Sequence, residues 1–142
     1  MKTLFKAFAW TLLLASAAGH ADERPPIADK VVAYQGEEGV KVWTLRIGER
    51  SANQALVQVD GADHDWNLKI AKMNVEKSAR DTRYVTQVDG QRYVALIVQQ
   101  GYGELYLPGE SNPLRVYSDT RLGEKGNAEH FLTDYLNETP AP

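Results

Sequence analysis

The sequence predicts a mainly β domain: a small antiparallel sandwich or barrel of about seven strands with one C-terminal helix. Three observations predict this fold class. Apolar and polar residues alternate with a period of two through most of the chain, and the alternating segments are separated by glycine-containing turns. The spacing changes to that of an amphipathic helix only near the end. The chain has 142 residues, enough for one domain with a modest core.

The first 21 residues have the three parts of a secretory signal peptide. Lys2 and Lys6 give a basic start, residues 7–18 form an uncharged apolar run, and Gly19-His20-Ala21 supplies small residues before a cut. The apolar run is shorter than the roughly 20 residues that span a bilayer. We therefore expect cleavage after Ala21 and export to the periplasm as a soluble protein.

The remaining chain divides into three parts. Residues 22–30 are mostly polar and contain Pro25-Pro26, which predicts a flexible leader. Residues 31–138 form the single β-rich domain. Residues 139–142, with two more prolines, form a tail that we expect to be disordered.

Composition limits the function classes. After the signal the chain has 14 basic residues against 19 acidic ones, a net charge of −5, and no basic patch. Nucleic-acid binding requires such a patch, and an acidic protein has no attraction to anionic lipid, so neither partner is expected. The chain contains no cysteine, which excludes disulfides, a thiol nucleophile and a thiolate metal site.

The first half of the domain predicts four strands. Residues 31–34 and 40–47 flank a glycine-containing turn, and residues 55–59 form the third strand. The second strand has its largest apolar side chains on one face, which we assign to the core: Trp43, Leu45 and Ile47. The fourth strand is predicted from alternating apolar residues: Trp66, Leu68, Ile70, Met73 and Val75.

The second half begins with the clearest hairpin signal. Residues 84–88 and 91–98 flank Asp89-Gly90, which favours a two-residue type I′ turn. Residues 93–98 are apolar on both faces and predict a central strand covered on both sides. Two short strands follow, at 105–107 and 114–117. Asn127 then caps a helix with one apolar face, formed by Ala128, Phe131, Leu132, Tyr135 and Leu136.

One turn gathers residue types that bind metals. Asp60, Asp63, His64 and Asp65 supply three carboxylates and an imidazole that could hold a divalent cation. The segment does not match an EF-hand loop. The alternative, which we favour, is a solvated turn whose acidic side chains bond to nearby backbone N–H groups. We therefore expect neither a metal nor another cofactor.

A tyrosine-rich segment is the candidate binding site. Alternation places Leu105 and Leu107 on one face of a strand, and Tyr102, Glu104 and Tyr106 on the other. If the leucines point inward, two tyrosines and a carboxylate point outward together. Tyrosine is common in recognition surfaces because it joins a rigid apolar ring to a polar tip. The alternative is that these tyrosines pack beneath the C-terminal helix.

No catalytic constellation emerges from the sequence. Beyond the signal the only histidines are His64 and His130, and no serine lies in a nucleophile-elbow pattern. We therefore expect an exported protein-binding domain without catalytic activity that contacts a protein of the cell envelope. An inhibitor of an envelope hydrolase, or an immunity protein against a toxin, is the most concrete form of this hypothesis. The alternative is a periplasmic module that binds a small ligand or a metal.

Overall fold

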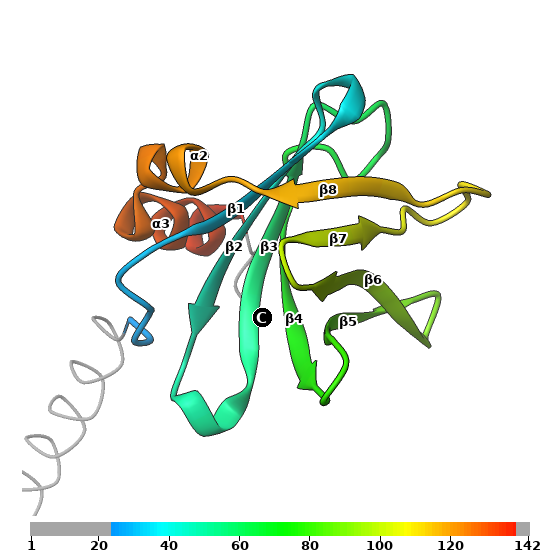
Figure 1. The fold of residues 1–142 in the computed structure, drawn as a ribbon. Coiled ribbons are helices and arrows are strands. Elements are labelled where there is room, and N and C mark those ends of the chain that lie inside the picture. Colours follow the sequence, from blue (N-terminus) through cyan, green and yellow to red (C-terminus); the bar gives the residue numbers. More distant parts are fainter. Residues whose placement is uncertain (1–23, 139–142) are drawn as a thin grey trace, which may run out of the picture.

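The computed structural model describes residues 24–138 and shows a closed antiparallel barrel (Figure 1). Each strand is hydrogen-bonded to the next in sequence, and the last strand pairs with the first. The eight strands are β1 (Val32–Gly36), β2 (Lys41–Ile47), β3 (Gln54–Asp60), β4 (Ile70–Lys77), β5 (Thr82–Val88), β6 (Gln91–Gln99), β7 (Tyr102–Leu105) and β8 (Leu114–Ser118). The predicted fold class is confirmed, as the barrel form with eight strands. The predicted signal peptide and tail lie outside the described residues.

Buried side chains fill the barrel interior. Fourteen of them form one cluster: Tyr34, Val40, Val42, Ala55, Val57, Val59, Met73, Val75, Tyr84, Ala95, Leu96, Leu105, Leu107 and Val116. An eight-stranded barrel is just wide enough for side chains of this size to fill it. The barrel interior is therefore a packed core. This core gives the strands a rigid support for the residues on their outer surface.

A second core lies outside the barrel, beneath the helix α3 (Ala128–Glu138). Phe131 and Leu132 of this helix pack against Leu45 and Ile47 of β2. The predicted core face of β2 is confirmed: Leu45 and Ile47 are buried in this core, and Trp43 packs against it. The opposite face of β2, which the sequence did not assign to a core, points into the barrel. Both faces of this strand are buried because a helix covers its outer side.

The Asp89-Gly90 hairpin is confirmed. Both residues have positive φ, 52° and 78°, as a type I′ turn requires. The prediction that β6 is covered on both sides was wrong. Val94 and Ile97 are partly exposed and belong to neither core cluster, because none of the helices within residues 24–138 covers this part of the barrel.

The predicted fourth strand begins later than expected. β4 starts at Ile70, and residues 61–69 form an irregular loop. Trp66 packs from this loop against the barrel core, while Leu68 has a φ of 66° and is 54% exposed. Trp66 and Leu68 therefore lie in a loop rather than in a strand, and only Trp66 contributes to the core. The continuation through Met73 and Val75 is confirmed.

Two helices follow β8. The Asn127 side chain accepts a hydrogen bond from the backbone N–H of His130 at 3.0 Å, which confirms the predicted cap of α3. The shorter helix α2 (Thr120–Lys125) was not predicted; Asp119 caps it by accepting from Leu122 N–H at 3.0 Å. In the part of the chain that the structure describes, neither helix is long and apolar enough to cross a membrane.

The described part of the predicted leader is attached to the barrel. The N–H of Gly48 donates to the carbonyl of Pro26 at 2.8 Å, and the N–H of Ala28 donates to that of Arg46 at 3.0 Å. The Arg24 guanidinium donates to Thr133 Oγ1 of α3 at 3.1 Å. Residues 24–28 thus contact both β2 and the C-terminal helix.

Because two tyrosines are buried in the barrel core, we expect the protein to lose stability at alkaline pH. Burial raises the pKa of both Tyr34 and Tyr84, which are 6% and 9% exposed. Unfolded tyrosine ionises near ~10, so their contribution is complete below that pH and is lost as the pH rises toward the folded-state pKa. We expect each tyrosine to lower the free energy of unfolding by up to about 1.4 kcal/mol per pH unit between pH 10 and its own folded-state pKa.

Urea denaturation between pH 8 and 11.5 measures this slope. Tyr34→Phe should make it shallower, whereas Tyr117→Phe, at a tyrosine that is 49% exposed, should not. An identical slope in the wild type and in Tyr34→Phe would contradict the burial of this phenol.

Candidate functional site

The candidate tyrosines lie on the outer surface of the barrel. Leu105 and Leu107 are buried in the interior cluster, 0% and 5% exposed, so alternation directs Tyr102, Glu104 and Tyr106 outward. The core beneath α3 is built from other side chains and includes none of these three. The structure thus places the predicted residues on the outer side of β7 and at the start of the following loop, where all three are half-buried, and they do not pack beneath the C-terminal helix.

Strand register adds two residues that the sequence did not reveal. Tyr117 of β8 lies opposite Tyr102, and Arg115 lies opposite Glu104. The Arg115 guanidinium lies 4.7 Å from the centroid of the Tyr102 ring, a cation–π contact. We call this surface the tyrosine face and define it as Tyr102, Glu104, Tyr106, Arg115 and Tyr117.

Hydrogen bonds orient two of the three tyrosines of this face. The Tyr102 hydroxyl donates to Gln99 Oε1 at 2.8 Å, and the Tyr106 hydroxyl donates to Glu104 Oε1 at 3.5 Å. Partial burial and the neighbouring Glu104 carboxylate raise the pKa of Tyr106, so its hydroxyl keeps its proton. These contacts reduce the freedom that the side chains would lose on binding, which favours recognition.

The candidate metal turn does not converge on a site. The His64 Nε2 atom lies 2.7 Å from the carbonyl oxygen of Pro108, and its Nδ1 accepts from the Trp66 N–H at 3.0 Å. These two bonds fit a neutral imidazole that carries its hydrogen on Nε2. Within residues 24–138, no three histidine, aspartate or glutamate side chains gather closely enough to hold a metal ion. Asp60, Asp63, His64 and Asp65 therefore give no support to a metal centre.

His64 instead fastens two loops at one end of the barrel. It bonds to the loop between β7 and β8 at Pro108, and Tyr93 bonds to the same loop by donating to the Tyr106 carbonyl at 2.9 Å. Trp66 lies between these two side chains in edge-to-face contacts, with centroids 6.0 and 5.9 Å apart. The Tyr106 end of the tyrosine face is thus held by side chains from β6 and from the β3–β4 loop.

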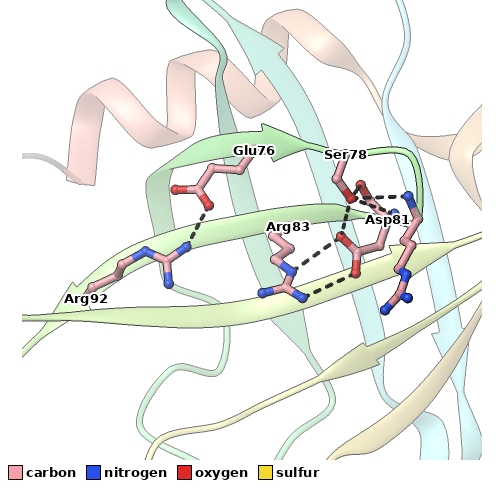
Figure 2. Close-up of polar contacts among 6 residues, drawn as sticks. Glu76, Ser78, Asp81, Arg83 and Arg92 are labelled. Atoms are coloured by element: carbon pink, nitrogen blue, oxygen red, sulfur yellow. Dashed lines mark hydrogen bonds and ion pairs between the residues drawn. The ribbon is translucent and has the colours of Figure 1, made fainter.

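A second group of polar side chains lies at the β4–β5 end and is internally paired (Figure 2). Arg92 donates to Glu76 at 2.6 Å, and Arg83 donates to both oxygens of Asp81 at 3.3 and 3.5 Å. The Ser78 hydroxyl accepts from backbone N–H groups of the same turn and contacts Asp81. These contacts order a turn and a sheet surface, and they leave Arg83 and Arg92 already matched with carboxylates.

No protein-family model, curated protein or solved structure matches this chain.

Proposed function

We propose that this chain is an exported protein-binding domain without catalytic activity, which acts in the cell envelope through the tyrosine face. Inhibition of an envelope hydrolase, or neutralisation of a toxin, is the form of activity that we propose. The compartment rests on the signal-peptide pattern of residues 1–21.

The observation that carries the proposal is the arrangement of the tyrosine face. Two of its tyrosines, Tyr102 and Tyr106, are hydrogen-bonded, and an arginine stacks on Tyr102. Tyrosine and arginine are the residue types most often found, with tryptophan, at the energetic centres of protein interfaces. The outer surface of a closed barrel fits a protein partner better than a small molecule, which prefers a concave site.

Two other observations support protein binding over the small-ligand and metal alternative. Side chains occupy the barrel interior, and both ring nitrogens of His64 are hydrogen-bonded to loop residues. A surface hollow of about 450 Å³ between β1 and α2 is the place where the small-ligand alternative would locate its site. Its lining includes Val31, Val32 and Gly123, and none of the tyrosine-face residues.

An affinity capture tests the proposal. The full chain is expressed in an exporting bacterium, and the intact mass of the periplasmic product shows whether residues 1–21 have been removed. This product is immobilised and exposed to envelope extract. We expect one stoichiometric protein partner, with Tyr102→Ala/Tyr106→Ala losing at least tenfold in affinity for it, because hot-spot truncations cost ~2 kcal/mol or more.

The matched control is Lys77→Ala/Arg80→Ala, which removes two exposed side chains at the β4–β5 end. The control should bind like the wild type, and thermal melts should show all three proteins folded. Unchanged affinity of the tyrosine variant would remove the assignment of the site, and an empty column would remove the protein-binding function.

A further inference from the structure

Within residues 24–138, the Arg115 guanidinium contacts an aromatic ring and donates no hydrogen bond. Its side chain is exposed, and its guanidinium stacks on the Tyr102 ring at 4.7 Å. Among the described residues it forms no ion pair within 4.0 Å. A guanidinium presents five N–H donors in a planar fork that matches the two oxygens of a carboxylate. The stacking therefore orients a donor group that stays available to a partner.

Within residues 24–138 Arg115 forms no ion pair, although a carboxylate lies opposite it on the adjacent strand. Glu104 lies directly opposite Arg115 in the β7–β8 ladder, yet Glu104 accepts a hydrogen bond from the Tyr106 hydroxyl instead. By contrast, Arg83 on β5 and Arg92 on β6 are bonded to Asp81 and Glu76 (Figure 2). The contact with Tyr102 thus draws the Arg115 side chain toward the tyrosines and away from the acid opposite it.

We propose that Arg115 is the specificity-determining anchor of the tyrosine face and binds an aspartate or glutamate side chain of the protein partner. This inference rests on the proposed function and names the chemistry of the partner at that site. The guanidinium stacks on Tyr102, and Tyr117 lies opposite Tyr102 on β8, so both rings offer apolar surface near a carboxylate bound by Arg115. An acidic side chain set between apolar neighbours fits this arrangement.

The charge of the face selects a single carboxylate over a polyanion. Glu104 lies opposite Arg115, so its carboxylate offsets the charge of the guanidinium, and the pair offers no net positive charge to attract a run of phosphates. One carboxylate can approach the exposed guanidinium while its neighbours on the partner contact the tyrosine rings. The occupant is therefore an acidic segment of a protein.

The test uses the partner recovered by capture and two arginine variants of the exported chain. Arg115→Lys keeps the positive charge and loses both the fork and the stacking geometry. Arg121→Lys makes the same change at an exposed arginine in α2. We expect Arg115→Lys to raise the dissociation constant about tenfold or more, and Arg121→Lys to leave it unchanged.

Carboxylate footprinting gives a second measurement. Partner carboxylates are amidated with a carbodiimide and glycinamide, with and without the captured chain, and the sites are read by mass spectrometry. The wild type should protect one acidic residue of the partner, and Arg115→Lys should expose it again. Absence of a protected carboxylate would overturn the inference, even if the affinity falls.

The outcomes separate this inference from the proposed function. If Arg115→Lys binds like the wild type while Tyr102→Ala/Tyr106→Ala binds weakly, the carboxylate anchor is wrong and the protein-binding face stands. If Arg115→Lys and Tyr102→Ala/Tyr106→Ala both bind like the wild type, then both the carboxylate anchor and the tyrosine face are wrong. If no protein is captured, the function fails and the inference fails with it.

Discussion

Replacing Leu132 with alanine is expected to lower the free energy of unfolding by about 2–5 kcal/mol. Leu132 is 1% exposed and lies at the centre of the core between α3 and the barrel. Truncation removes buried methyl groups and leaves a cavity that the sheet beneath cannot close, because β2 and β3 are held from the other side by the barrel core. Chemical denaturation followed by far-ultraviolet circular dichroism measures the loss.

Leu136→Ala is the matched control for this prediction. It makes the same change in the same helix, at a leucine that is 37% exposed. We expect a cost below about 1 kcal/mol, because a surface substitution creates no cavity. Equal costs at the two positions would mean that α3 does not pack on the barrel through Leu132.

Gly61→Ala is expected to be nearly as costly, by about 2–5 kcal/mol. Gly61 has a φ of +81°, which alanine adopts at a cost of about 1–2 kcal/mol. A Cβ atom at this position would also collide with the backbone carbonyl of Gly39, in the adjacent β1–β2 loop. A backbone atom cannot rotate away as a side chain can, so the two loops must separate. Thermal and urea denaturation measure the combined effect.

Gly90→Ala separates the two contributions. Gly90 has a φ of +78°, but nothing lies within 4 Å of an added Cβ atom. This variant should therefore lose only the cost of the left-handed conformation, about 1–2 kcal/mol. If Gly61→Ala and Gly90→Ala are equally stable, the close approach of the two loops is not present in solution.

Local patterns in the sequence were enough to predict elements whose geometry depends on neighbouring residues. Asp89-Gly90 requires positive φ at both positions, so the turn and its two strands followed from adjacent residues. The cap of α3 by Asn127 is local in the same way. The inward position of Leu105 and Leu107 followed from alternation, and it placed three residues of the tyrosine face on one side of the strand.

Contacts between distant segments decided what the sequence could not predict. Alternation in β2 showed two faces but not which one the barrel encloses, because α3 supplies a second apolar surface. Trp66 looked like a strand residue because nothing nearby shows that its ring packs on Tyr93, beyond the following hairpin. Arg115 and Tyr117 joined the candidate site only through strand register, which a single sequence does not encode in a readable form.

The pairing of β1 with β8 has a consequence for how the chain acquires its structure. These strands come from opposite ends of the domain, so the ring of hydrogen bonds can close only after nearly the whole chain is available. Until then a partly formed sheet has two unpaired edges, which can associate with other chains. Contacts of such long sequence separation also slow folding. A chain truncated before residue 114 would keep both edges open, and we expect it to aggregate rather than to form a smaller stable domain.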